Sequence, residues 1–253
     1  MADLVEIVAA LDLLLEPDGF ADHCPNGLQV QGRSEVRTIA TGVSANLELF
    51  ERAIQAGAGL VLTHHGLFWD GDDPRVVGRL HDRLQILMAN DVSLAAYHLP
   101  LDGHPRVGNN ALIADGLGCV DPEPFAAHRG RSIGVRGRFA SGGIPPDELE
   151  RRIAGLTGRR PLAFWAGPDP VRTIGIVSGA ASGHLDDAIA LGLDAFMTGE
   201  PAERVMAQAE ESGIHFIAAG HYATETFGVR ALGAHLVERF GVDHVFVDVP
   251  NPI

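Results

Sequence analysis

The sequence predicts an α/β fold built from two pseudo-repeated lobes with mixed sheets, and two observations support this prediction. Strand-like and helix-like segments alternate along the 253 residues, which is typical of α/β proteins. In addition, the segment Ala96–Asp102 recurs as Ala219–Glu225, and each copy carries a histidine four residues before a carboxylate. A second correspondence joins residues 53–65 to residues 188–200. We therefore expect one lobe over residues 1–125 and another over residues 126–253.

The first lobe is expected to alternate helices with short buried strands. The apolar run at residues 60–62 is typical of a buried strand, and the apolar residues between 75 and 90 recur near one face of a helix. The elements predicted in order are a helix at 3–15, a strand at 38–43, a helix at 46–56, a strand at 60–63, a helix at 75–90, a β-like run at 92–96 and a helix at 108–115.

The second lobe is expected to repeat this order after a linking stretch that glycine and proline residues punctuate. The linking stretch has its own strand at 133–139, a helix at 146–156 and a strand at 162–166. The repeated elements are a strand at 173–178, a helix at 184–191, a strand at 194–197, a helix at 202–211, a strand at 214–218 and a helix at 222–240.

Charge and composition exclude several classes of function. The net charge of −14 argues against nonspecific nucleic-acid binding, which needs a basic surface. All 19 basic residues are arginine, so a lysine Schiff base and the phosphate-binding lysine of a Walker A site are excluded. Residues 128–160 hold eight arginines and three acids. That stretch either meets an anionic substrate or another subunit, or forms a solvated face.

The sequence also predicts a cytoplasmic protein without a membrane segment. Asp3, Glu6 and Asp12 interrupt the apolar N-terminus, which does not fit a secretory signal peptide. No apolar run approaches the length of a membrane span. The two cysteines, Cys24 and Cys119, form neither a disulfide framework nor a thiolate metal site.

The first candidate metal ligands are His64 and His65, which follow a predicted strand. In open α/β folds, ligands collect at the carboxyl ends of the strands. Neighbouring side chains in a regular strand point to opposite faces, so a pair of ligands is expected in the turn after the strand. The alternative interpretation is one buried histidine and one surface histidine.

The repeated segments supply the remaining candidates. His98 and Asp102 lie on one loop, whereas His221 and Glu225 lie four residues apart near the start of a predicted helix and so share one face. His244 and Asp248 have the same spacing but no counterpart in the repeat, and we interpret this pair as structural.

Together these candidates predict a dinuclear metal site where the two lobes meet. Three imidazoles and two carboxylates, with His98 beside them, exceed what one catalytic ion with an open position needs. They suit two divalent ions about 3.5–4 Å apart, bridged by a carboxylate and a water. Without a thiolate, such a site accepts Zn, Mn, Fe, Co or Ni, and the sequence does not distinguish them.

Five blocks, in order along nearly the whole chain, resemble the hallmark blocks of one family. It is the family of GTP cyclohydrolase 1 type 2 homologues, also called NIF-three-like dinuclear-metal-centre hexameric proteins. The blocks are Asn26–Val30, Thr63–Gly66, Tyr97–Asp102, Thr198–Glu200 and Gly220–Glu225.

This resemblance implies a NIF-three-like fold and two divalent metal ions per subunit. The positions that match the family's ligands are His64, His65, Asp102, His221 and Glu225, and the resemblance implies that Glu225 bridges the two ions. It further implies a toroidal homohexamer with the metal sites facing an internal cavity.

Two classes of function follow from such a site. The first is a metal-dependent hydrolase of a small substrate, possibly a nucleotide or a phosphoester, in which His98 moves a proton near the metals. In the alternative interpretation His98 only donates a hydrogen bond. The second class is a non-catalytic ring that handles metal or acts as a regulatory scaffold. An open coordination position beside a substrate-sized pocket would separate the two.

Overall fold

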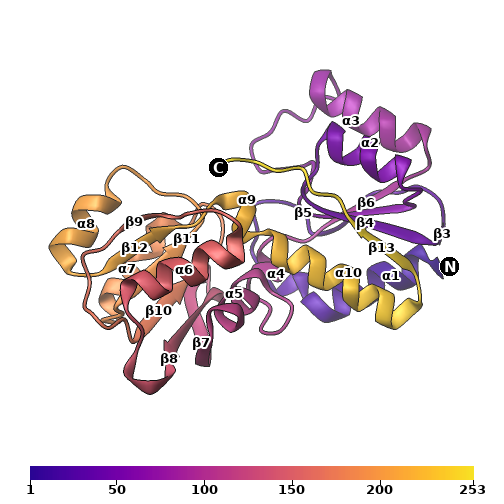
Figure 1. Ribbon diagram of the computed structural model, residues 1–253. Coiled ribbons are helices and arrows are strands. Elements are labelled where there is room, and N and C mark those ends of the chain that lie inside the picture. Colours follow the sequence, from indigo (N-terminus) through magenta and orange to yellow (C-terminus); the bar gives the residue numbers. More distant parts are fainter. The chain divides into compact units, whose positions relative to one another are not determined.

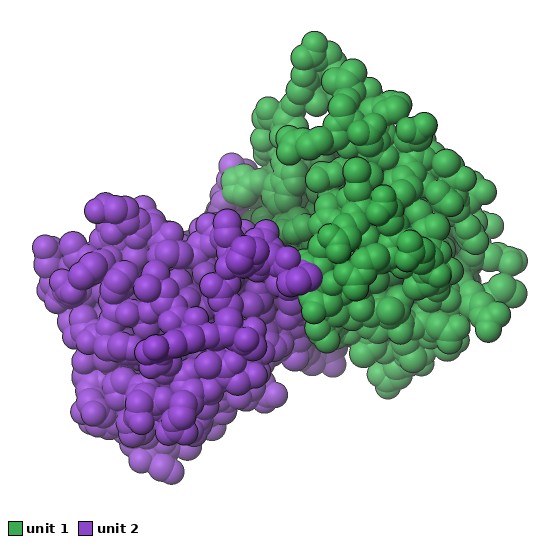
Figure 2. Space-filling model, turned by 45° about the horizontal axis from the view of Figure 1, so that its top comes forward, with its two compact units in different colours: residues 1–101, 228–249 green, residues 102–227, 250–253 purple.

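The computed structural model describes all 253 residues, which form two compact units (Figure 2). Unit 1 contains residues 1–101 and 228–249, and unit 2 contains residues 102–227 and 250–253. The sequence-based division at 125 and 126 placed the whole C-terminal part in the second lobe. In the structure, a strand near the C-terminus instead pairs with the first long strand of unit 1. The units are therefore not two consecutive halves of the chain.

Unit 1 is built on a five-stranded sheet in the order β13-β4-β5-β6-β2, in which only the edge strand β2 runs antiparallel to its neighbour (Figure 1). A small antiparallel pair, β1 and β3, lies apart from it. The strands are β1 (Ala2–Asp3), β2 (Gly27–Val30), β3 (Glu35–Val36), β4 (Thr38–Ser44), β5 (Leu60–His65), β6 (Ser93–Ala96) and β13 (Asp243–Phe246). The helices are α1 (Leu4–Leu15), α2 (Leu47–Gln55), α3 (Gly78–Ala89) and most of α10 (Thr226–Phe240), with a short 3-10 turn at Pro17–Gly19.

The sheet of unit 1 is covered on both faces. The helices α2 and α3 connect β4 to β5 and β5 to β6, and right-handed crossovers place both on one face. They bury Leu49, Phe50 and Leu87 against Val61 and Leu94 of the sheet. Figure 1 shows α1 and α10 beyond the other face. Because both faces are covered, the central parallel strands β4, β5 and β6 are buried along nearly their whole length.

Unit 2 repeats this plan in a six-stranded sheet of order β7-β8-β10-β11-β12-β9. Its parallel centre is β10-β11-β12, and β9 runs antiparallel beside β12 just as β2 does beside β6. The strands are β7 (Cys119–His128), β8 (Arg131–Phe139), β9 (Leu162–Phe164), β10 (Thr173–Ile176), β11 (Ala195–Thr198) and β12 (His215–Ala218). The helices are α5 (Asn109–Leu117), α6 (Pro146–Thr157), α7 (Leu185–Ala190), α8 (Val205–Ser212) and α9 (His221–Thr224), and α4 (Leu99–Asp102) ends at the first residue of this unit. Short 3-10 turns lie at Ala140–Gly142 and Ser182–His184.

The core of unit 2 lies between α5, α6 and the sheet. Apolar side chains of these two helices pack against β10, β11 and β12 through Ile113, Leu149, Ile174, Met197 and Ile217. The opposite face carries a group of phenylalanines that includes Phe196 and Phe216, with ring centroids 6.1 Å apart. The predicted α/β fold with mixed sheets and an internal repeat is therefore confirmed.

Five strands were not predicted from the sequence: the two-residue strands β1 and β3, which pair with each other, and β2, β7 and β13, each at an edge of its sheet. The strand β7 contains Pro122 and Pro124, which are tolerated because β7 is an edge strand. The strands β2 and β13 are four residues long and owe their place to pairing with β6 and β4. None of the helices is long and apolar enough to cross a membrane.

Candidate metal centre

Three imidazoles meet in unit 1 at the carboxyl ends of two neighbouring parallel strands. His64 and His65 end β5, and His98 follows β6. The ring centroid of His64 lies 4.7 Å from that of His65 and 5.0 Å from that of His98. One ligand atom from each of the three lies within 4.8 Å of the others.

The histidine pair was expected in the turn after the strand, and this expectation was wrong. β5 continues through His65 because the longer β4 still pairs with it: Ser44 lies opposite His65, and the Ala45 N–H donates to the His65 carbonyl at 2.9 Å. The two side chains at the last two positions of the strand nevertheless converge, because their ring centroids lie 4.7 Å apart.

A hydrogen bond at Nδ1 orients each imidazole of the pair. His64 Nδ1 lies 3.1 Å from the Tyr97 carbonyl oxygen, which only accepts, so Nδ1 carries the proton and Nε2 the lone pair of a neutral ring. His65 Nδ1 lies 3.0 Å from the Ser44 hydroxyl. Metal-binding histidines characteristically hold their second nitrogen in this way. Because Nδ1 of each ring is held, Nε2 is the nitrogen that would coordinate a metal ion.

His98 is held by a buried carboxylate that we did not identify from the sequence. Asp22 Oδ1 lies 2.7 Å from His98 Nδ1, while Asp22 Oδ2 accepts from the Leu99 N–H and from the Asn26 amide, each at 2.9 Å. Burial alone would raise the pKa of Asp22, but the hydrogen bond and charge of His98, with these donors, lower it well below its usual range. Asp22 is thus a fixed negative charge behind the His98 ring.

The block Asn26–Val30 ties these histidine-bearing segments together. Asn26 Oδ1 accepts from the His98 N–H at 2.7 Å. Gln29 accepts from the Leu67 N–H and donates to the Pro25 carbonyl, both at 2.8 Å, so it fixes the loop that follows His65. A side chain on Gly66 would collide with the Gln29 amide, which explains glycine after the histidine pair.

Unit 2 presents one imidazole between two carboxylates. His221 Nδ1 contacts Glu200 Oε1, and His221 Nε2 lies 3.1 Å from Glu225 Oε2. As predicted, His221 and Glu225 share one face, although the predicted continuous helix divides at Glu225 into α9 and α10. Burial would lower the pKa of His221, but Glu225 and Glu200 raise it to about 9. The ring therefore carries a proton at neutral pH that a metal ion would displace from Nε2.

The surroundings of two acidic side chains in unit 2, Asp102 and Glu225, fix where their carboxylates lie. Asp102 is buried, and its Oδ1 accepts from the Asn109 amide at 2.8 Å and from the Ser178 hydroxyl at 2.9 Å. Gly179, with φ of 68°, faces the Glu225 carboxylate so closely that a Cβ atom there would overlap Oε1. The glycine is needed to leave room for the carboxylate.

The donors fit a divalent ion bound by nitrogen and oxygen. Cys24 lies near Asp22 and His98, but burial and the charges of Asp22 and Asp70 raise its pKa to about 12, so it stays a thiol. Imidazole and carboxylate without thiolate suit Zn, Mn, Fe, Co or Ni. The chemistry of the donor set agrees with the metal type that the sequence predicts.

The structure thus places the predicted residues in two groups. His64, His65 and His98 gather in unit 1, and His221, Glu225 and Asp102 belong to unit 2. Asp22, Asn26 and Glu200 were not among our candidates. The internal repeat contains a signal for Glu200, because it aligns with His65, and Asn26 opens one of the recognised blocks. Nothing in the sequence marked Asp22.

Fold and donors together define a duplicated α/β protein whose units carry histidine and carboxylate groups able to bind metal. Residues 2–252 match the family described as Duf34/NIF3 (NGG1p interacting factor 3), and the chain belongs to this family. It is 47% identical over 249 residues to the GTP cyclohydrolase 1 type 2 homolog of Pseudomonas aeruginosa, with 98% of each chain covered. It is 40% identical over 253 residues to the homolog of Escherichia coli K12, again with 98% of each chain covered.

Solved structures give the same result. TTHA1606 from Thermus thermophilus superposes with a TM-score of 0.91 at 40% identity, and a structural-genomics protein named ybgI, of unknown function, with 0.93 at 38%. Both comparisons cover 100% of each chain. At 22% identity, HcgD from Methanocaldococcus jannaschii shares the fold, with a TM-score of 0.86. The predicted family and fold are confirmed.

Proposed function

We propose that this protein is a hydrolase that uses two divalent metal ions to act on a small substrate. The observation that supports it best is the orientation of the imidazoles, each fixed through Nδ1 by a carbonyl, a hydroxyl or a carboxylate. In this proposal His64, His65, Asp102, His221 and Glu225 bind the two ions, and Glu225 bridges them. Unit 1 would supply two imidazoles, and unit 2 would supply one imidazole and two carboxylates.

The chain's own residues would then orient the reactants and move a proton. Bound divalent ions would lower the pKa of water to near neutrality and stabilise negative charge on the substrate. His98 would accept or return the proton through Nε2, because Asp22 holds its Nδ1. Asn26 fixes the backbone of His98 and the carboxylate behind it, so both partners keep their positions.

A parallel measurement of metal content and turnover tests this proposal. The purified protein is supplied in turn with Zn, Mn, Fe, Co or Ni and screened against phosphoesters, nucleotides and cyclic amides. We expect metal-dependent hydrolysis that His98→Gln lowers by about 100-fold or more, the usual contribution of a general acid or base, with metal content unchanged. Metal binding without turnover of any substrate would contradict the hydrolase and favour the metal-handling ring.

The assembly and the location remain proposals as well. The family resemblance supports a toroidal homohexamer, and gel filtration with light scattering should give a mass near six times 26.8 kDa. A monomer at micromolar concentration would contradict the ring. Both cysteines are unbonded, as is usual in a reducing compartment, and this supports the proposed cytoplasmic location.

A further inference from the structure

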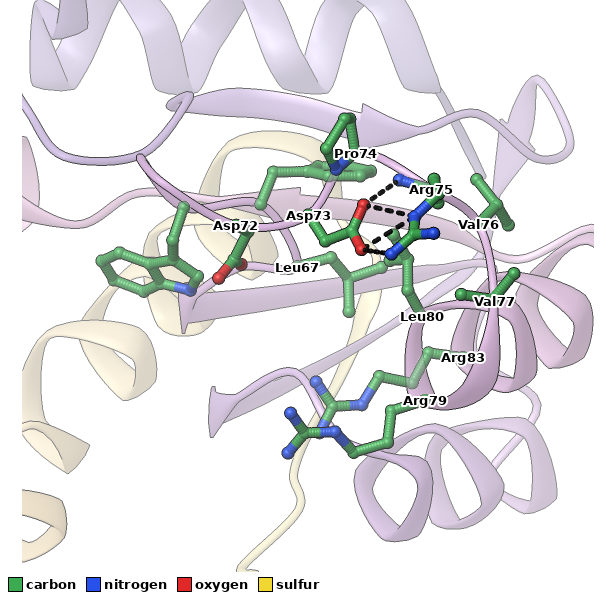
Figure 3. Close-up of a pocket in the computed structure, with 12 residues that line it drawn as sticks. Leu67, Asp72, Asp73, Pro74, Arg75, Val76, Val77, Arg79, Leu80 and Arg83 are labelled. Atoms are coloured by element: carbon green, nitrogen blue, oxygen red, sulfur yellow. Dashed lines mark hydrogen bonds and ion pairs between the residues drawn. The ribbon is translucent and has the colours of Figure 1, made fainter.

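Unit 1 contains a cavity of about 510 Å³ outside the metal-binding side chains (Figure 3). It lies between the segment that follows β5 and the first turns of α3. Pockets that bind small molecules typically have volumes of about 300–1,000 Å³ and combine apolar walls with a few polar groups. Leu67, Val76, Val77 and Leu80 form the apolar part of this wall. The cavity is thus large enough for a metabolite.

Two arginines of α3 bring positive charge to this cavity. Arg79 and Arg83 lie one helical turn apart on the same face, and Figure 3 shows that their side chains extend in the same direction. Neither forms an ion pair with a carboxylate. The pKa of the Arg83 guanidinium is lowered, first by burial and then by the charge of Arg79. Like charges four residues apart destabilise a helix. An anion bound between the two guanidinium groups would remove this repulsion in α3.

The acidic residues of the cavity do not neutralise this pair. Asp73 is occupied by Arg75, whose Nε lies 2.9 and 3.0 Å from the two carboxylate oxygens (Figure 3). Asp72 is the other carboxylate in the wall. After the Asp73–Arg75 pair is set aside, the lining holds two guanidinium groups, of Arg79 and Arg83, and one carboxylate, of Asp72, so the balance of charge is positive. The cavity therefore favours an anionic ligand.

The same cavity adjoins the imidazoles of unit 1 through Trp69. This residue lines the cavity, and its ring centroid lies 5.1 Å from that of His98 and 5.7 Å from that of His65. A molecule bound by the arginines and lying against the indole would thus extend toward the proposed proton-transfer residue. An indole provides a flat apolar surface for such a molecule.

We infer that Arg79 and Arg83 bind the phosphate group of a phosphorylated small molecule whose remaining part lies against Trp69. Two guanidinium groups match a phosphate dianion in charge and in hydrogen-bond geometry. The identification of this molecule as the substrate rests on the proposed hydrolase. Binding of phosphate by the arginine pair does not, and the two ideas can fail separately.

Calorimetric titration with inorganic phosphate tests the site in the full-length protein as purified and after metal removal by a chelator. The test variant is Arg79→Gln/Arg83→Gln, which keeps good helix-forming residues. The matched control is Arg52→Gln, which changes an exposed arginine outside the cavity that pairs with Glu48. We expect the double variant to raise the Kd for phosphate about tenfold or more, and the control to change it less than twofold.

Two results would overturn the inference. Unchanged phosphate affinity in the double variant would show that the pair does not bind the anion. Loss of affinity on metal removal alone would show that the ions bind it instead. If phosphorylated compounds are hydrolysed, the double variant should raise KM with little change in kcat. If phosphate binds through the pair and no compound is hydrolysed, the arginine site stands while the hydrolase proposal fails.

Discussion

The two units share one sheet plan but carry different chemistry at equivalent strand ends. In unit 1, β5 ends in two histidines, whereas β11, its counterpart in unit 2, is followed by Gly199 and Glu200. After β6 comes His98 with its Nδ1 on Asp22, and after β12 comes His221 with its Nδ1 on Glu200. Duplication has thus preserved the positions where side chains emerge while the side chains themselves have changed.

The difference teaches that neither unit alone carries the donors of a complete dinuclear centre. Unit 1 gathers three imidazoles, and its nearest carboxylate, Asp22, is already engaged by His98, Asn26 and Leu99. Unit 2 gathers carboxylates around one imidazole. The ligand set that we propose from the family resemblance draws on both units, so substitutions in either unit should lower the metal content.

The largest loss of bound metal is expected on substitution of Glu225, which tests most directly the role that we assign to unit 2. Glu225→Ala should remove bound metal more completely than Asp102→Ala, because a bridging carboxylate serves two ions and a terminal one serves a single ion. Elemental analysis of both purified variants measures this. Equal metal content in the two variants would contradict the bridging role.

Gly179→Ala should abolish metal binding through a purely steric effect. A methyl group there overlaps the Glu225 carboxylate, which must move. Gly192→Ala is a matched control, because Gly192 has a similar φ of 66° but no atom within 4 Å of the added Cβ. Both variants should lose about 1 kcal/mol of stability from the left-handed backbone. Gly179→Ala should lose more because of the overlap, and only this variant should lose metal. Full metal content in Gly179→Ala would contradict this account of the glycine.

In both units the sequence predicts the centre of the sheet better than its edges. The alternating pattern and the repeat were sufficient for the parallel centres of both sheets, because buried parallel strands are continuous apolar runs. The edge strand β7 escaped prediction because Pro122 and Pro124 interrupt its pattern, and β13 escaped it because its partner, β4, is distant in sequence. For the same reason Asp22 could not be found: its contact with His98 spans 76 residues.

The smallest effect is expected at His244, which has the histidine–carboxylate spacing but, in our interpretation, only a structural role. Its Nε2 lies 2.8 Å from the Thr41 hydroxyl, and burial, followed by the charge of Arg230, lowers its pKa. The unfolded chain therefore binds the proton at a higher pH than the folded protein does. Stability contributed by neutral His244 is present above pH 6.5 and is lost as the pH falls below it.

His244→Gln should remove this part of the pH dependence without changing metal content. Unfolding by urea at about pH 8 and about pH 5.5, on either side of the ordinary histidine pKa, gives the free energy of unfolding of each protein. The loss between the two pH values should be smaller in the variant than in the wild type. An equal loss would contradict the assignment, and a large drop in metal content would contradict the structural role.

The most direct test of the central claim is the metal content per subunit of protein purified without added metal or chelator. We predict about two ions in the wild type. His65→Ala in unit 1 and Glu225→Ala in unit 2 should each cause a sharp loss of both, because the two groups serve one centre. Close to zero ions in the wild type, with none taken up on addition, would contradict the dinuclear centre and the hydrolase built on it.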